Sequence, residues 1–61
     1  MTVTRLNTGI YQAVTDNAVF QIERYNDRSW HLFKMERGER EWHNDYGTKW
    51  EALVAAQETL A

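Results

Sequence analysis

Residues 18–35 of this chain read AVFQIERYNDRSWHLFKM, and this stretch decides the fold. Its first part, 18–25, carries apolar residues at alternate positions, which is the two-residue period of a β-strand with one buried face. Asn26-Asp27 is a turn signal, and residues 29–35 read as a second strand. Two strands joined by a short turn predict a β-hairpin at the centre of the chain.

Similar signals stand on both sides of this hairpin. A short run of β character, 10–14, precedes the turn signal Asp16-Asn17, and another, 40–43, follows the turn signal Arg37-Gly38. Three consecutive hairpins predict an antiparallel β-meander of three to four strands over residues 10–43. Residues 1–8 are placed outside the meander, as a segment that can be flexible.

A helix is predicted over residues 48–60. Thr48 and Glu51 have the spacing of a capping box, in which the Thr48 hydroxyl accepts from the Glu51 amide and the Glu51 side chain reaches back to the Thr48 amide. An apolar stripe follows at near-helical spacing, made of Trp50, Leu53, Val54 and Leu60, with Ala56 and Gln57 on the same side. The fold class predicted is therefore α+β, one 61-residue domain with its C-terminal helix packed on one face of the meander.

The register of the hairpins decides which face the helix covers, because residues paired across an antiparallel ladder share a face. Two-residue loops at all three turns give the pairs Ala13–Phe20, Tyr11–Ile22, Phe20–Phe33 and Phe33–Trp42. The covered face then carries Tyr11, Ala13, Phe20, Ile22, His31, Phe33, Met35 and Trp42. A three- or five-residue loop at Asn26 would exchange the two faces of strand 29–35.

The opposite face of the sheet is the predicted functional surface. One helix covers only one side of a sheet, and strand 29–35 is apolar on both sides. An apolar face left open on a small domain marks an interaction site, so we expect this face to bind a protein, either a second copy or a different partner. The expected partner-binding residues are Trp30, Leu32, Val19, Val14, Tyr25 and Lys34.

The charge of the chain favours protein over nucleic acid as the partner. Seven basic and nine acidic residues give a net charge of −2, whereas proteins that bind a phosphate backbone usually carry a net basic field. The basic residues flank turns at opposite ends of the meander instead of forming one patch. Nucleic-acid binding is the alternative, and it would use Arg24, Arg28, Lys34, Arg37 and Arg40.

Several other classes of function are not expected. The chain has no Cys and no secretory leader, which points to a cytoplasmic protein, and no apolar run approaches the roughly 18 residues of a membrane span. His31 and His43 point to opposite faces in the predicted register, so no metal site is expected. With no catalytic or cofactor motif, and little room for a pocket, we expect no enzyme activity, no cofactor and no small-molecule substrate.

The order of strands followed by a helix resembles a known family. Trp30-His31-Leu32-Phe33 in the middle strand, and the helix entry Tyr46-Gly47-Thr48-Lys49-Trp50-Glu51-Ala52, look like the arm-type and AP2-like DNA-binding domains of phage integrases, and like small accessory proteins of actinobacterial phages. The resemblance covers about residues 18–60. In the integrase-type family, an exposed sheet face rich in Arg and Lys reads the major groove. Here the corresponding face carries Gln21, Glu23 and Glu41 around Lys34.

Overall fold

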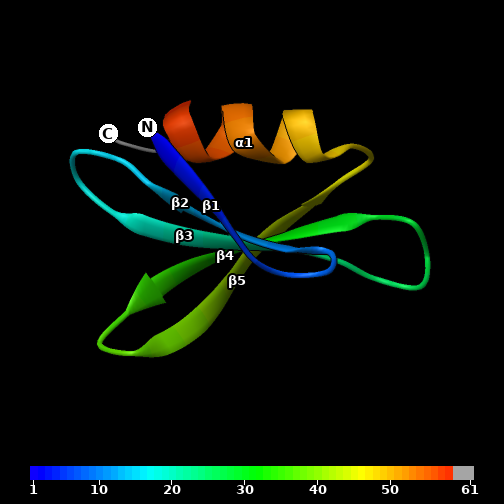
Figure 1. Cartoon of the computed structure of the whole chain (residues 1–61), viewed down its shortest axis with the longest axis horizontal. Helices are drawn as coiled ribbons and strands as arrows, with labels where there is room; N and C mark the ends of the chain where they lie inside the picture. Colours follow the sequence, from blue (N-terminus) through cyan, green and yellow to red (C-terminus); the bar gives the residue numbers. More distant parts are fainter. Residues whose placement is uncertain (59–61) are drawn as a thin grey trace.

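The computed structural model describes residues 1–58. It contains one sheet and one helix, in the order β1 (Thr2–Asn7), β2 (Ile10–Val14), β3 (Val19–Arg24), β4 (Trp30–Glu36), β5 (Glu39–Tyr46) and α1 (Lys49–Glu58). Each strand pairs antiparallel with the next along the chain, so the sheet is an open β-meander (Figure 1). The α+β class with a C-terminal helix is confirmed.

The described chain forms five strands, so the expectation of three to four is wrong. The additional strand is β1, which pairs with β2 from Thr2 opposite Val14 to Asn7 opposite Ile10. It lies within residues 1–8, for which the sequence predicts no strand. All six residues of β1 are exposed, so no alternation of buried and exposed side chains marks it in the sequence. The last strand also extends beyond residue 43, to Tyr46.

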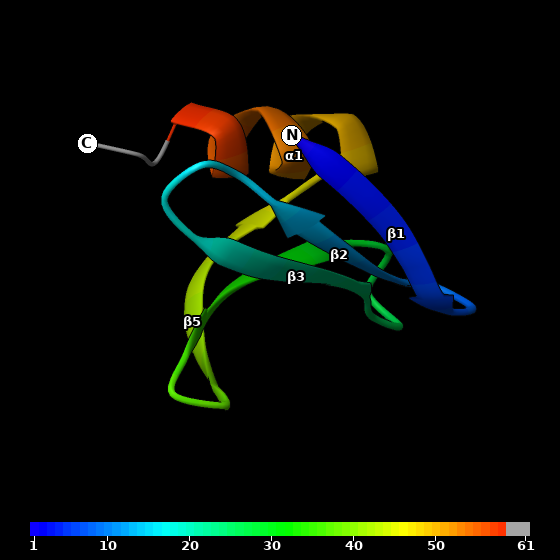
Figure 2. The same cartoon turned by 60° about the vertical axis from the view of Figure 1, so that its left-hand side comes forward.

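The core lies between α1 and one side of the sheet (Figure 2). Phe20, Ile22 and Leu32 are fully buried there, and α1 contributes Leu53 with two alanines, Ala52 and Ala56. Alanine side chains are short, so the helix axis lies close to the sheet and the larger strand residues fill the seam. The core is small, as expected for a chain near the lower size limit for independent folding.

The apolar stripe predicted for the helix is correct only in part. Leu53 and Ala56 are buried, but Trp50 is 72% exposed and Gln57 is exposed as well. The helix faces the sheet with its alanines because a Trp at the seam would hold it away from Phe20 and Ile22. Leu60 and the predicted end of the helix lie outside the described residues.

The predicted N-terminal cap of the helix is present, with one difference. The Glu51 amide donates to Thr48 Oγ1 at 3.1 Å, as expected. The Glu51 carboxylate accepts from the Thr48 hydroxyl at 3.1 Å, and not from the Thr48 amide. The cap still satisfies one of the amide groups that a helix leaves without a partner in its first turn.

The turn between β3 and β4 overturns one predicted register. The Arg28 amide donates to the Tyr25 carbonyl at 3.0 Å, and the Tyr25 amide donates to the Ser29 carbonyl at 3.0 Å. The loop therefore has three residues, 26–28, and Arg28 closes it with a φ of 66°. This is the three-residue hairpin in which a turn is followed by a left-handed residue.

An odd loop length shifts the pairing of β3 and β4 by one residue. Phe20 lies opposite Lys34, so the predicted pair of Phe20 with Phe33 is wrong. The other predicted pairs, Ala13–Phe20, Tyr11–Ile22 and Phe33–Trp42, are confirmed. Because side chains alternate between faces, the shift exchanges the two faces of β4 and, through pairing, those of β5.

Candidate functional site

The helix-free side of the sheet, here called the open face, is built from three rows of cross-strand neighbours. One row holds Val14, Val19, Met35 and Arg40; the middle row holds Gln12, Gln21, Phe33 and Trp42; the third holds Ile10, Glu23, His31 and Asp45. Residues of neighbouring rows are two positions apart along β2, β3 and β4, and on β5 a bulge at His43 separates Trp42 from Asp45 by three, so all twelve side chains project from the same side. The open face is thus mixed, with apolar, amide and charged groups in reach of one another.

Aromatic residues dominate the β4–β5 half of the open face. Phe33 and Trp42 lie directly opposite each other in the ladder. Phe33 is only 8% exposed, because the guanidinium of Arg40 lies 3.8 Å from the centroid of its ring. Trp42 has no such cover and is 56% exposed. Val14 adds a second exposed apolar side chain, on β2.

The charged groups of the open face pair with one another. Arg40 Nη2 lies 2.8 Å from Glu23 Oε1, and the pair reaches diagonally across the ring of Phe33. Both side chains are about a third exposed, so this ion pair is worth at most about 1 kcal/mol. Its main effect is to leave this part of the face with little net charge.

A second network orients Trp42. The indole Nε1 of Trp42 donates to Asp45 Oδ1 at 2.8 Å, and the same oxygen lies 3.3 Å from His31 Nδ1. The His31 ring stacks on Tyr25 with centroids 3.8 Å apart. Its Nε2 lies 2.9 Å from Ser29 Oγ. Two hydrogen bonds and the His31–Asp45 contact between them therefore connect the β3–β4 turn to the exposed tryptophan of β5.

Ser29, His31 and Asp45 stand in the order of a Ser-His-Asp triad, but their hydrogen bonds differ from one. The Ser29 amide and hydroxyl both donate to Asp27, and these bonds lower the pKa of that carboxyl from its ordinary value. An ionised Asp27 can only accept hydrogen bonds, so the hydroxyl proton of Ser29 is directed at Asp27 and not at His31. In a triad that proton passes to the imidazole. The arrangement here is that of a network that fixes a turn.

The predicted partner-binding residues divide between the two faces. Val14, Val19 and Tyr25 lie on the open face, as expected. Trp30, Leu32 and Lys34 lie on the helix side, and Leu32 is fully buried, so their placement on the open face is wrong. The one-residue shift at the β3–β4 turn is the cause.

The residues that the prediction missed are those that the same shift brings to the open face. They are His31, Phe33, Met35, Arg40 and Trp42. A signal for the odd loop exists in the sequence, because Asp27 stands two residues before Ser29 and its carboxylate accepts from the Ser29 amide at 3.0 Å. Such side-chain bonds to the backbone are typical of tight turns.

The predicted nucleic-acid residues are not brought together. Arg28 and Arg37 lie in turns at opposite ends of β4, with φ angles of 66° and 54°. Arg24 and Lys34 face the helix side, whereas Arg40 is on the open face and pairs with Glu23. The structure therefore separates the five residues over two faces and two ends of the sheet.

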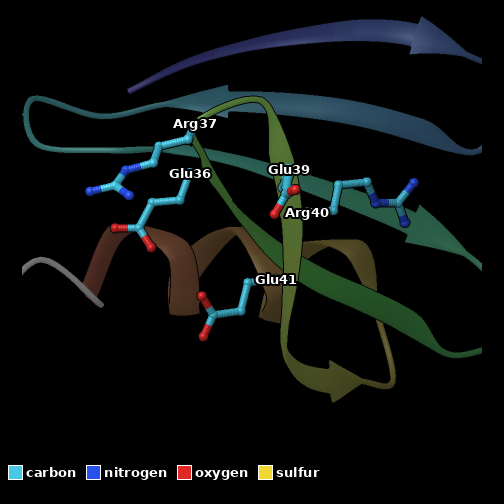
Figure 3. A pocket seen from close by; sticks show the side chains of 5 residues that line it. All are labelled: Glu36, Arg37, Glu39, Arg40 and Glu41. Atoms are coloured by element: carbon cyan, nitrogen blue, oxygen red, sulfur yellow. The ribbon is translucent and has the colours of Figure 1, made fainter.

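A charged hollow of about 400 Å³ lies at the β4–β5 turn (Figure 3). It is lined by Glu36, Arg37, Glu39, Arg40 and Glu41. The side chains of Glu36 and Glu41 point away from that of Arg40 in the close view, so they do not converge on one point. Within residues 1–58, no three His, Asp or Glu side chains are grouped so as to hold a metal ion.

Comparison with known proteins gives no relative. The sequence matches no known protein family, and neither a curated protein nor a solved structure shows significant similarity to it. In the part of the chain that the structure describes, α1 is too short to cross a membrane.

Proposed function

We propose that this chain is a small, non-catalytic protein-interaction module that works through its open face, and that a second copy of the chain is the partner. The observation that carries the proposal is the exposure of Trp42, 56%, beside the apolar row of Val14, Val19 and Met35. Large aromatic residues contribute most of the energy at protein interfaces when they are buried there.

The charges of the open face favour a second copy. Because Arg40 and Glu23 neutralise each other, a strongly acidic or basic partner gains little from this surface. Gln12 and Gln21 lie opposite each other on the face, and an amide side chain both donates and accepts. In a two-fold dimer the same surface faces itself, so amide donors of one copy can meet amide acceptors of the other.

The size of the face predicts weak association. Four strands about 4.8 Å apart, with five residues each at about 3.3 Å, give a face of roughly 15 by 17 Å. Two such faces bury well below the roughly 1,600 Å² of a standard interface. We therefore expect a dissociation constant on the order of 10–100 micromolar.

Two tryptophans make a matched test. Sedimentation velocity over a concentration series should show the wild type moving from monomer to dimer. Trp42→Ser should keep the protein monomeric, because it removes the most exposed ring of the open face. Trp50→Ser removes an even more exposed ring on the other side of the sheet and should dimerise like the wild type.

The proposal is overturned by a wild type that stays monomeric at millimolar concentration, or by equal loss of dimer in both variants. Circular dichroism should show both variants folded, because neither ring is in the core. A different protein that binds the open face would instead leave the wild type monomeric.

Single-stranded nucleic acid is a second candidate, favoured by one observation. Trp42 and Tyr25 are both exposed on one sheet face, and bases stack on such rings for about 1–3 kcal/mol each. Binding should be weak and insensitive to sequence because the arginines are separated. Fluorescence anisotropy with labelled single-stranded and duplex oligonucleotides measures it, and tight sequence-specific duplex binding would instead favour the integrase-like alternative.

A further inference from the structure

The outward side of α1 carries a hollow that is separate from the open face. Trp50 stands in the first turn of the helix, 72% exposed, and Tyr46 ends the strand before it. Both rings line a hollow of about 450 Å³, whose other walls are Glu51, Val54, Ala55 and Glu58. Because α1 lies on the opposite side of the sheet from the open face, the two surfaces can be occupied at the same time (Figure 2).

This hollow has an acidic rim. Within residues 1–58, neither Glu51 nor Glu58 forms an ion pair, and Glu51 accepts only from the Thr48 hydroxyl and uses one oxygen for it. Lys49 is next in sequence to Trp50, but its Nζ lies over the ring of Tyr11, 4.4 Å from the centroid. The ammonium group of Lys49 is thus directed toward β2, and Lys49 is not among the residues that line the hollow.

The helix itself adds to the negative potential. The last turn of α1 contains no basic residue, so the partial negative charge at its C-terminal end is not offset by a side chain. Glu58 lies in that turn. The hollow therefore runs along α1 from the indole of Trp50 and the carboxylate of Glu51 in the first turn to Glu58 at the negative C-terminal end.

We propose that the hollow beside Trp50 binds the guanidinium group of an arginine side chain presented by a partner protein. A cation is attracted to the face of an indole ring, and the attraction is stronger for Trp than for Tyr or Phe. A guanidinium is planar and weakly hydrated, so it can stack on Trp50, and the carboxylates of Glu51 and Glu58 along the same hollow attract its charge. The compact, strongly hydrated ammonium of lysine fits the same walls less well.

The test uses the indole N–H signals of the protein in ¹⁵N–¹H correlation spectra. Titration with a capped Gly-Arg-Gly tripeptide should shift the Trp50 signal in a saturable way, with a dissociation constant on the order of millimolar for a single side chain. The signals of Trp30 and Trp42 should stay in place. A citrulline tripeptide has the same shape without the charge and should cause no saturable shift, and a lysine tripeptide should bind several-fold more weakly.

Three variants separate the contributions, with binding followed through the Val54 amide signal. Trp50→Leu keeps an apolar side chain without the π face, and Glu58→Gln keeps the shape without the charge. We expect each to weaken binding of the arginine tripeptide by about five-fold, which corresponds to about 1 kcal/mol. Trp42→Leu should bind like the wild type. The spectra show directly whether each variant is folded.

The proposal is overturned if the Trp50 signal shows no saturable shift with the arginine tripeptide. It is also overturned if citrulline or lysine tripeptides bind as tightly, or if Trp50→Leu and Glu58→Gln bind like the wild type. None of these outcomes depends on dimerisation through the open face, so the two proposals fail separately.

Discussion

The two sides of the sheet bury aromatic and aliphatic residues by different means. On the helix side, Phe20, Ile22 and Leu32 are fully buried beneath α1. On the open face, Phe33 is nearly as well buried, but its cover is the Arg40 side chain held by Glu23. A helix excludes water from a whole seam, whereas one arginine covers one ring. The helix side therefore determines stability, and the open face keeps Trp42 available for contact.

The largest effect is expected in the helix seam. Leu53→Asp should unfold the chain, because it places a charge without a partner among buried apolar residues. Trp50→Asp changes the same helix three residues earlier, at a position that is 72% exposed, and should leave the fold intact. Circular dichroism melting curves compare the two variants. A cooperative melting transition of Leu53→Asp with the wild-type amplitude and midpoint would refute the docking of α1.

A smaller effect separates the two faces of one strand. Leu32 and Met35 both lie in β4, but Leu32 is fully buried on the helix side and Met35 is half-buried on the open face. Leu32→Ala should cost about 2–5 kcal/mol of unfolding free energy, because it leaves a cavity in the seam. Met35→Ala should cost less than about 1 kcal/mol. Urea denaturation measures both, and equal losses would mean that the open face is part of the core.

The salt concentration should distinguish the cover that Arg40 gives to Phe33 from the cover that α1 gives to the core. Arg40→Met keeps an unbranched apolar stem over Phe33 but removes the ion pair with Glu23. We expect a loss of about 0.2–1 kcal/mol at low salt that shrinks at high salt, because exposed ion pairs are screened. Leu32→Ala should show the same loss at both salt concentrations. If the stability lost in Arg40→Met does not depend on salt, Arg40 covers Phe33 by packing alone.

The smallest effect on stability is expected at the turn between β3 and β4, whose length sets the register of these two strands. The bonds from Ser29 lower the pKa of Asp27 below its ordinary value of 3.8. A carboxyl group whose pKa is lower in the folded state than in the unfolded state stabilises the fold fully at pH values above its unfolded-state pKa. This contribution is lost as the pH falls through the folded-state pKa. The wild type should therefore lose more stability between neutral pH and about pH 3 than Asp27→Asn. Denaturant titrations at both pH values test this, and identical losses would contradict it.

Most of the fold can be predicted from the sequence, for reasons that specific residues show. The alternation in 18–25, the turn residues at 16–17 and 37–38, and the Thr48 cap each act over a few residues, and each is present in the structure. β1 was missed because its side chains are all exposed, and pattern analysis detects burial. The apolar stripe of the helix includes Trp50 because the prediction rests on spacing, and spacing does not reveal that the seam is filled by Ala52 and Ala56.

The sequence by itself determined that this chain is an α+β domain. It also determined that the central strand is apolar on both sides and that one helix covers only one of them. Only the tertiary structure decided which side is which. One residue more or less in the loop between Tyr25 and Ser29 exchanges Leu32 with Phe33, and both are acceptable to a core. Local propensities hardly distinguish the two registers, because side chains alternate with a period of two. The contacts between the sheet and α1 together select the register. In that register Leu32 lies opposite Ile22 beneath the alanines of α1, and Trp42 is exposed on the other side of the sheet.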